Sequence, residues 1–358
     1  MKHSFRKTAA AAMGLLGLAV MSTPALSAEC SPENWQACKG KPWVDGDTMA
    51  TPLGSQWWPN PLWGEDDEAG STNWYTKPEV IARALSANAG NGKVYKLGHP
   101  YTDDMPLFGA RKFSLRTPVP TGVLDGLGGN KITWNDEFLA TEVGQVGTQF
   151  DGLGHIGVTM GAPGEGGKMR WYNGFSAVDI TSAYGLKKLG TEKLHPIVAR
   201  GVLIDVSAIW GGDMKAGDLI TMEHVKKALA AQGMSDFEFA AGDAVIIRTG
   251  WEKHWGDPPT YNDGCPGIGM EVARWIAEDV QAGVTGFDTW PGDAVPNPDP
   301  ACVFCVHTYL QTRHGIVNQE NMKLSQLAAD GVYTFTYVYS PAPIAGATGS
   351  MGAPIAIH

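Results

Sequence analysis

The most informative stretch of the sequence is Gln145-Val-Gly-Thr-Gln-Phe-Asp-Gly-Leu-Gly-His155. Its Gly-Thr pair predicts a tight backbone turn. If the residues that follow are extended, Gln145, Gln149 and Asp151 point to the same face, because side chains two apart in a strand do so. A divalent metal requires an anionic oxygen beside neutral donors converging in this way. His155 would then complete the ligand shell or stand beside it as a general base.

A structural role is the alternative for the same residues. In that case Asp151 caps a turn and His155 is a hydrogen-bonded core residue. Short Asp/His pairs are common by chance, so spacing alone favours this alternative. Evidence from the rest of the chain is needed to choose between the two.

The stretch resembles the H-x-G-T-H-x-D-x-P-x-H signature of the cyclase superfamily of metal-dependent hydrolases, with glutamine at the first two histidine positions. That family includes bacterial kynurenine formamidase, isatin hydrolase and trans-dienelactone hydrolase. Further segments resemble the family in the same order along the chain: 63–73, 200–205, 242–250, 307–310, 315–316, 320–321, 346–350 and 354–356. This co-linearity is more specific than any single motif.

The resemblance implies a set of site residues. Carried over by position, His155 is the catalytic histidine, and the metal ligands are Gln145, Gln149, Asp151, His307 and Glu320. Glutamine is a weaker and harder donor than imidazole, so zinc affinity is expected to drop in favour of Mn²⁺ or Mg²⁺. The cofactor predicted is a divalent metal, Mn²⁺ or Zn²⁺, with Mg²⁺ as a further option. Leu153 and Gly154 also depart from the signature and could relax the loop.

The composition indicates a folded protein with many loops. The chain has 358 residues, of which 43% are apolar and 18% charged, so it can bury a sizeable core. Its 46 glycines and 23 prolines predict a large share of turns. The formal charge of −10 offers no basic face, so no nucleic-acid partner is expected.

The pattern of elements favours an α+β fold, and the resemblance implies the swivelling β/β/α cyclase-like fold in a single domain. A capping box at residues 76–79 predicts a helix start. Strands are predicted at 94–97, 201–205 and 244–248, helices at 221–232 and 270–281, and a closing strand at 332–338.

The N-terminal residues predict export. A cationic start, an apolar run at 9–20 and small residues at 22–28 make residues 1–28 a secretory signal peptide. No stretch is long and apolar enough to span a bilayer, so no membrane association is expected. The protein should be secreted, into a bacterial periplasm. Residues 29–62 are predicted to be an irregular N-terminal arm, and residues 63–358 the hydrolase domain.

Export changes the interpretation of the five cysteines. Cys30 and Cys38 are predicted to form a local disulfide, since an oxidising compartment favours it. Cys302 and Cys305 predict either a structural disulfide or two buried thiols. Cys265 could pair with one of them, and one cysteine is left over.

Several residues are weaker candidates for a substrate pocket. Trp63 and Trp74 could form part of an aromatic wall, and Asp288 and Trp290, with Asp293 nearby, could line the pocket. The alternatives are core or dimer contacts for the tryptophans and turn capping for the aspartates.

Together these features predict a secreted metal-dependent hydrolase that opens an amide, formamide, cyclic imide or lactone. It would be similar to arylformamidases, whose best-known substrate, N-formylkynurenine, arises in tryptophan catabolism to kynurenine. The alternatives are a lactonase or dehydratase acting on a small organic acid, and a non-catalytic periplasmic binding protein on the same fold. The expected partner is a small-molecule substrate, and the family implies a homodimer or homotetramer.

Overall fold

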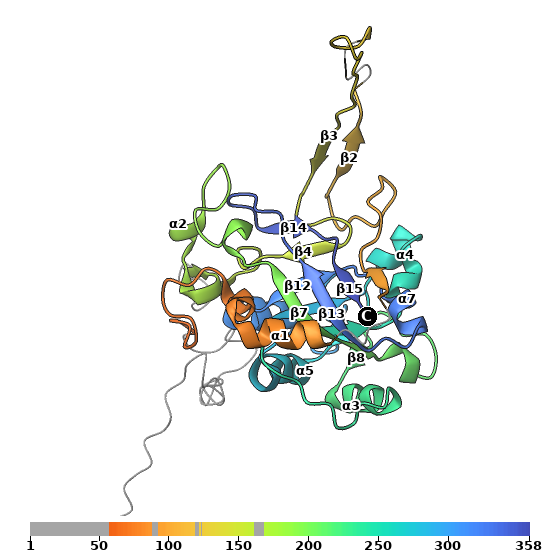
Figure 1. Ribbon diagram of the computed structural model, residues 1–358. Helices are drawn as coiled ribbons and strands as arrows, with labels where there is room; N and C mark the ends of the chain where they lie inside the picture. The colour runs from red at the N-terminus through yellow and green to blue at the C-terminus, as the bar shows by residue number, and fades with distance from the viewer. Residues whose placement is uncertain (1–56, 88–91, 119–121, 123, 161–167) are drawn as a thin grey trace, which may run out of the picture.

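A mixed sheet of nine strands forms the centre of the molecule in the computed structural model (Figure 1). The structure describes residues 57–87, 92–118, 122, 124–160 and 168–358. The predicted signal peptide and the Cys30–Cys38 disulfide lie outside these ranges. In spatial order the strands are β1 (Val94–Lys96), β15 (Ile355–Ile357), β13 (Thr334–Tyr339), β7 (Ile197–Asp205), β9 (Ala244–Arg248), β11 (Val284–Phe287), β12 (Val317–Glu320), β4 (Gln149–Asp151) and β14 (Gly349–Met351).

The middle of this sheet is parallel and its two sides are antiparallel. β7, β9, β11 and β12 run parallel to one another, whereas every other neighbouring pair is antiparallel. The central strands are almost continuously apolar and buried, as expected for a sheet covered on both faces. The predicted strands at 94–97, 201–205 and 244–248 are confirmed.

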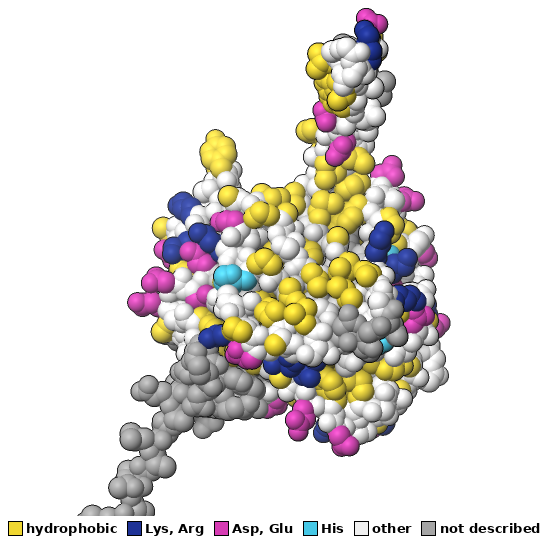
Figure 2. Space-filling view, in the orientation of Figure 1, with side chains coloured by type: hydrophobic (Ala, Val, Ile, Leu, Met, Phe, Trp, Pro, Cys, Tyr) yellow, Lys and Arg dark blue, Asp and Glu magenta, His cyan; other side chains and the backbone are white. Residues whose placement is uncertain are grey.

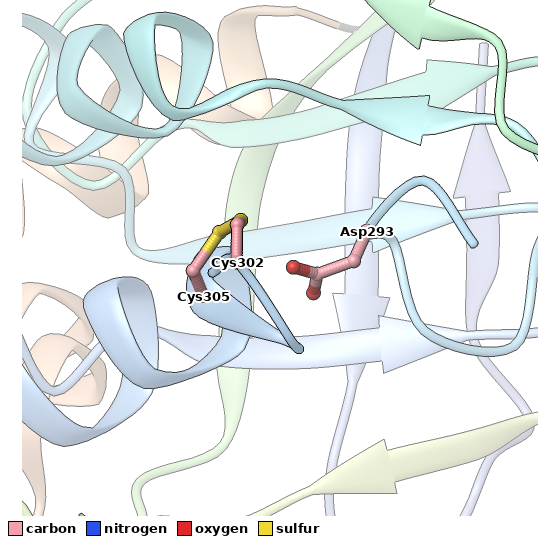
Figure 3. A group of neighbouring side chains, drawn as sticks. All are labelled: Asp293, Cys302 and Cys305. Carbon is pink, nitrogen blue, oxygen red and sulfur yellow. A yellow bond between two sulfur atoms is a disulfide. The ribbon is translucent and has the colours of Figure 1, made fainter. Parts of the chain in front are cut away.

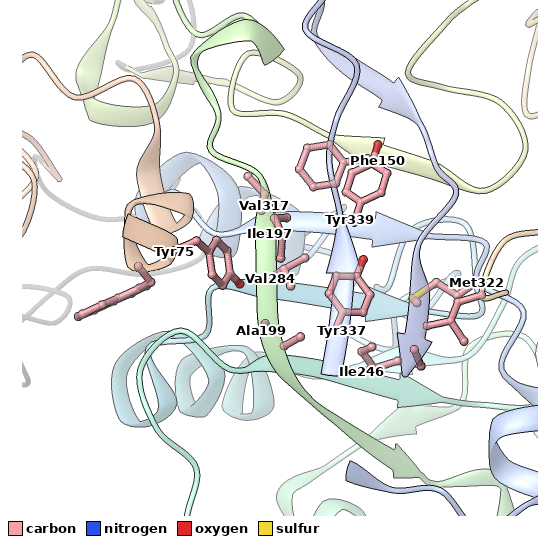
Figure 4. Packing of buried hydrophobic residues seen from close by; sticks show 14 of the residues in the cluster. Tyr75, Phe150, Ile197, Ala199, Ile246, Val284, Val317, Met322, Tyr337 and Tyr339 are labelled. Carbon is pink, nitrogen blue, oxygen red and sulfur yellow. The ribbon is translucent and has the colours of Figure 1, made fainter. Parts of the chain in front are cut away.

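Side-chain alternation divides the core into two parts. Leu203 and Ile246 pack into a cluster with α1 (Pro78–Ser86), drawn in Figure 4. Their neighbours Ile204 and Val245 pack instead with α3 (Met222–Ala231) and α5 (Met270–Arg274). Because successive strand residues face opposite sides, these clusters lie on the two faces of one sheet. The described chain therefore forms the predicted single α+β domain.

The remaining helices are short. They are α2 (Ala177–Ile180), α4 (Pro258–Asn262), α6 (Cys305–His307), α7 (Ser325–Ala329) and the 3-10 helices Gly70–Thr76, Tyr172–Gly174, Thr191–Lys193, Ser207–Ile209 and Trp251–His254. Two π-helical turns, Trp275–Val280 and Thr308–Arg313, directly continue α5 and α6. Within the described ranges no helix is long and apolar enough to cross a bilayer.

Two sequence predictions of element ends are wrong. Thr76 does not cap α1: its hydroxyl donates to the Asn73 carbonyl, and the N-cap is Lys77. Lys77 precedes a proline and is therefore extended, which moves the helix start to Pro78. The strand predicted at 332–338 begins at Thr334 and does not close the chain, because β14 and β15 follow it. The helices predicted at 221–232 and 270–281 are confirmed, the second with its π-helical end.

Three small ribbons complete the fold: β2 (Phe113–Arg116) with β3 (Phe138–Thr141), β5 (Val158–Met160) with β6 (Lys168–Arg170), and β8 (Leu219–Ile220) with β10 (Gly267–Ile268). The β2–β3 hairpin projects far from the body (Figure 1). At the N-terminal end of the described chain, residues 57–62 form no helix or strand. The buried Trp57 packs into the core cluster of α3 and α5.

Candidate metal centre

The pairing of β4 with β12 creates a buried polar site. These strands run antiparallel with Asp151 opposite Asn318 and Gln149 opposite Glu320. His307 lies at the end of α6, where the helix turns into the π-helical segment. One ligand atom each from Asp151, His307 and Glu320 lies within 4.8 Å of the others, and all three residues are buried. Side chains distant in sequence thus converge as a metal site requires.

The turn before β4 depends on a glycine. Gly147 has a φ of +61°, and a Cβ at this position would lie 2.5 Å from the ring of Tyr101. Only glycine tolerates both the left-handed backbone and this approach without strain. The tight turn predicted from the Gly147-Thr148 pair is therefore confirmed, and it delivers Gln149 to the start of the strand.

The three side chains carry more negative than positive charge. His307 Nε2 lies 2.9 Å from Glu320 Oε1 and 3.5 Å from Asp151 Oδ2. Burial and the neighbouring Asp151 raise the pKa of Glu320, against the opposing effect of His307. Burial works to lower the pKa of His307, but Glu320 and Asp151 raise it well above its ordinary value. Glu320 is thus costly to ionise without a further cation beside it, whereas His155, His307 and Gln145 lower the pKa of Asp151 against the opposing effect of burial.

One oxygen of this group has no hydrogen-bond partner. Asp151 Oδ1 accepts a hydrogen bond from Gln145, whereas Asp151 Oδ2 is buried with no hydrogen-bond donor among the described residues. Buried polar atoms are nearly always paired in native proteins. Two carboxylates, one of them with an oxygen that lacks a hydrogen bond, and an imidazole fit a divalent cation in type and arrangement.

Asp293 holds the His307 ring. Its Oδ2 lies 2.9 Å from His307 Nδ1 and accepts the His307 backbone N–H, and its Oδ1 accepts the Val306 N–H. A carboxylate on one imidazole nitrogen commonly fixes the ring so that the other nitrogen can bind a metal. Sequence reasoning named Asp293 only as a pocket candidate. Nothing in the local pattern showed that it would reach His307.

Gln145 and Gln149, both predicted as ligands, differ from each other in their hydrogen bonds. The Gln145 amide donates to Asp151 Oδ1, and its oxygen accepts from Arg111 at 3.0 Å. The Gln149 amide donates to Glu320 Oε2, and no donor to its oxygen is found among the described residues. Gln145 is thus occupied as a support for Asp151, whereas the Gln149 oxygen is available to a metal. A metal bound to the Gln145 oxygen would displace the hydrogen bond from Arg111.

His155 lies beside the three ligands rather than among them. Its Nε2 is 3.9 Å from Asp151 Oδ2, and its side chain is 20% exposed on the wall of a cavity. Burial, with the charges of His307 and Arg111, lowers the pKa of His155 despite the opposing effect of Asp151. A neutral imidazole facing a cavity is suited to accept a proton.

A cavity that opens to solvent lies next to the site. Its apolar wall consists of Phe108, Ile156, Trp290, Pro291 and Phe304. Phe108 stacks on Trp290 with ring centroids 4.4 Å apart, and the Phe304 ring meets Trp290 edge-on. Trp290 thus lies on the wall of the cavity, on one side of the polar group.

The other three pocket candidates lie elsewhere. Trp74 is buried in the core cluster of α1 and packs edge-on against Trp63. Asp288 is fully buried and accepts hydrogen bonds from Thr249 and from the Gly250 N–H. Among the described residues none of these three lines this cavity. Core packing and turn capping were the stated alternatives, and both are observed.

Sequence reasoning missed two polar residues of the site. Arg111 lies just before β2, lines the cavity and binds Gln145. Asn318, two residues before Glu320 on β12, donates to Glu320 Oε1. Asn318 could have been found from strand alternation, because it lies two residues from Glu320 and therefore on the same face of β12. Arg111 belongs to no motif, and only the folded chain brings it to the site.

Cys302 and Cys305 form a disulfide beside Asp293 (Figure 3). Cys265 is a free, buried thiol, so it pairs with neither. The prediction of a structural disulfide at C-x-x-C is confirmed over the alternative of two thiols.

Comparison with known proteins agrees with this geometry. The family model described as "Putative cyclase" matches residues 95–294, more than half of the chain. The chain belongs to this cyclase family. The crystal structure of a protein described as a novel cyclase is 29% identical, with a TM-score of 0.69, and the match covers 83% of this chain and 96% of that one. The predicted cyclase-like fold is therefore confirmed.

Two more distant structures share the fold of the cyclase family. Isatin hydrolase A from Labrenzia aggregata, bound to benzyl benzoate, is 18% identical with a TM-score of 0.52, covering 77% of this chain and 98% of its own. Isatin hydrolase A from Ralstonia solanacearum is 19% identical with a TM-score of 0.52, covering 78% and 98%. No curated protein matches the chain significantly.

Proposed function

We propose that this cyclase-family protein is a metal-dependent hydrolase that opens an amide, formamide, cyclic imide or lactone bond, as arylformamidases and isatin hydrolases do. The observation that carries the proposal is the convergence of Asp151, His307 and Glu320 around an unpartnered carboxylate oxygen, with His155 beside them on the cavity wall. A purely structural cluster would satisfy that oxygen within the protein.

The residues divide into holding and proton-transfer roles. Asp151, His307 and Glu320 would hold a divalent ion, with the Gln149 oxygen as a further donor. Such an ion supplies a Lewis acid that polarises a carbonyl and lowers the pKa of water. Asp293 keeps His307 Nε2 turned toward the carboxylates, and Gln145 keeps Asp151 in place. His155 Nε2 accepts the proton of the attacking water and returns it to the leaving atom.

The metal proposed is Mn²⁺ or Zn²⁺, with Mg²⁺ less suited. Two carboxylates and one imidazole form a mixed oxygen and nitrogen set, which suits these transition metals more than an all-oxygen cation. The substrate is proposed to be a planar molecule small enough for the cavity, since three aromatic rings line it.

Export is a separate part of the proposal. The pattern of residues 1–28 is that of a secretory signal, and a structural disulfide such as Cys302–Cys305 supports an oxidising compartment. A bacterial periplasm meets both conditions.

The proton-transfer role is tested by the variant His155→Ala. Metal content should stay near that of the wild type, whereas turnover of formanilides, isatin-like imides or lactones should fall by roughly 10²–10⁴. The measurements are elemental analysis of protein purified without chelator and steady-state hydrolysis. His254→Ala is the matched control, since His254 is half-buried and lies outside the cavity wall.

Two results would contradict the proposal. A His155→Ala protein that retains full rate removes the base. Wild-type protein that holds no metal and hydrolyses none of these compounds after Mn²⁺ or Zn²⁺ is added removes the activity.

A further inference from the structure

Phe304 is an aromatic residue of the cavity wall with an unusual backbone conformation. Its φ of +51° and ψ of +39° are left-handed. A bulky residue rarely adopts this conformation, because its Cβ then lies too close to the following carbonyl oxygen. Strained residues of this kind gather at ligand sites, where the position of the side chain matters.

The left-handed backbone sets the direction of the Phe304 ring apart from that of the helix that follows it. Phe304 is the N-cap of α6, so a right-handed conformation here would extend the helix by one residue. Instead the ring lines the cavity and meets both Trp290 and His307 edge-on, with ring centroids 5.9 Å and 6.1 Å apart. The ring therefore contacts both the aromatic wall and a candidate metal ligand.

The Cys302–Cys305 disulfide closes the loop that contains Phe304 (Figure 3). The two Cα atoms are 5.1 Å apart, and both cysteines are buried. The Cys302 N–H donates to the Asp299 carbonyl, which holds the first cysteine to the preceding turn. A closed loop this short leaves Phe304 few backbone conformations to which it could relax.

Val303 is the other residue enclosed by this loop, and it does not line the cavity. Its side chain is 74% exposed. Exposed apolar side chains are common on this protein, and many lie along the β2–β3 hairpin (Figure 2), so exposure alone does not make Val303 part of a binding surface. The loop thus places one of its two enclosed side chains on the cavity wall and leaves the other in solvent.

We propose that the Cys302–Cys305 disulfide gives the site a preference for aromatic substrates by holding Phe304 as a ring of the cavity wall. Phe304 is then a specificity-determining residue, and the two cysteines are positioning residues. An aromatic ring bound in the cavity gains an edge-on or offset contact with Phe304, whereas an aliphatic ring gains only the burial of its surface. The inference rests on the proposed function, because it concerns the substrate of the same site.

Loss of the disulfide should act on Phe304 and not on the metal. Without the link, residues 302–305 can rearrange until Phe304 is right-handed, which relieves the backbone and withdraws the ring from Trp290. Asp293 still holds the His307 ring and accepts the backbone N–H groups of Val306 and His307. The metal ligands therefore need not move.

The test compares phthalimide with succinimide, two cyclic imides that differ by one fused benzene ring. Isothermal titration calorimetry on protein loaded with Mn²⁺ or Zn²⁺ measures the dissociation constant of each, and KM replaces it for a probe that is hydrolysed. The wild type should prefer phthalimide. Cys302→Ser/Cys305→Ser and Phe304→Leu should each weaken phthalimide binding by about 3–10-fold and succinimide binding by less than about twofold. Phe304→Tyr, which keeps the ring, should keep the preference.

A double-mutant cycle separates the positioning of the ring from a general loosening of the site. In the Phe304→Leu background, loss of the disulfide should weaken phthalimide binding no further, because no ring is left to misplace. Val303→Thr keeps the disulfide and is the matched control, so it should bind both probes as the wild type does. Elemental analysis should give the same metal content in every variant, and circular dichroism the same fold.

Four results overturn the inference. A wild type without a preference for phthalimide has no such selectivity, and a disulfide-free variant that keeps the preference does not depend on the link. Equal losses for the two probes show a general disturbance, and additive losses in the cycle show that the disulfide and Phe304 act separately. A wild type that prefers phthalimide but hydrolyses nothing removes the proposed activity alone, so the two proposals fail on different measurements.

Discussion

Two groups of buried, ligand-type side chains lie on opposite sides of the His307 ring, and they differ in what remains unsatisfied. On the Nδ1 side, Asp293 lies with Cys302 and Cys305 (Figure 3). The two sulfurs are joined to each other, and both Asp293 oxygens accept hydrogen bonds. This group is chemically closed and serves to position the ring.

On the Nε2 side, Asp151 and Glu320 compete for one imidazole. Glu320 Oε1 is 2.9 Å from His307 Nε2, and Asp151 Oδ2 has no hydrogen-bond donor in the described chain. Both groups contain three buried residues of metal-binding types. The difference shows that unsatisfied charge, and not residue type, distinguishes a candidate metal site from a structural cluster.

The largest expected effect on metal binding is at the group of Asp151, His307 and Glu320. Asp151→Asn removes the unpartnered anionic oxygen, so metal affinity should fall by more than 100-fold and turnover by about 10³ or more. Elemental analysis and hydrolysis rates measure both. Asp213→Asn, at a surface aspartate 82% exposed, is the control and should change neither. Normal metal content in Asp151→Asn would remove the distinction between the two groups.

Asp293→Asn tests whether the group of Asp293, Cys302 and Cys305 positions the His307 ring. Loss of a carboxylate that orients a metal-binding imidazole should lower metal affinity by about 10–100-fold while the ion can still bind. Titration with Zn²⁺ or Mn²⁺ against a chelator measures this. Asp243→Asn, at a buried aspartate paired with Arg83 and Arg200, should lower stability without changing metal affinity. Equal affinities in Asp293→Asn and wild type would contradict the positioning role.

The double variant Cys302→Ser/Cys305→Ser tests whether the sulfur atoms take part in metal binding. We expect metal content to be unchanged and the free energy of unfolding to fall by about 2 kcal/mol, because the closed loop is short. Chemical denaturation measures the second quantity. A loss of metal as large as that in Asp293→Asn would show that the closed group is a ligand set after all.

The smallest expected effect concerns Glu252, a carboxyl group outside both groups. Its Oε1 is also buried without a hydrogen-bond donor in the described chain, and burial with the charge of Asp288 raises its pKa from 4.5 to about 7. The nearest cation is the Arg248 guanidinium, with Nε 3.6 Å from Glu252 Oε1, and it lowers the pKa of Glu252 less than burial and Asp288 raise it.

A carboxyl group with a raised pKa binds its proton more tightly in the folded state. Its contribution to stability is therefore complete below pH 4.5 and is lost as the pH rises through 7. The melting temperature of the wild type should fall, relative to Glu252→Gln, by about 2 °C between pH 5 and pH 8. Parallel pH profiles of the two proteins would show that Glu252 ionises normally.

The sequence by itself determined the local structure and the family. Apolar runs of strand length can only be buried between covering layers, so 201–205 and 244–248 were identified without coordinates. The turn at Gly147 followed from a glycine that the backbone requires. The spacing of Gln149 and Asp151 placed both on β4, because strand alternation is a property of the backbone alone. The similarity spread along the chain predicted Asp151, His307 and Glu320 as one group.

Only the tertiary structure decided how those residues are used. Whether Gln145 binds a metal or supports Asp151 depends on Arg111, which reaches it from a separate segment just before the β2–β3 hairpin. Whether Asp293 or Asp288 serves the site depends on which backbone N–H groups and rings fold against each carboxylate. Trp74 is buried in the core, Trp63 is partly buried against it, and Trp290 lines the cavity, although all three are the same residue type. Hydrogen-bond partners and burial are set by long-range packing, and no local pattern of residues encodes them.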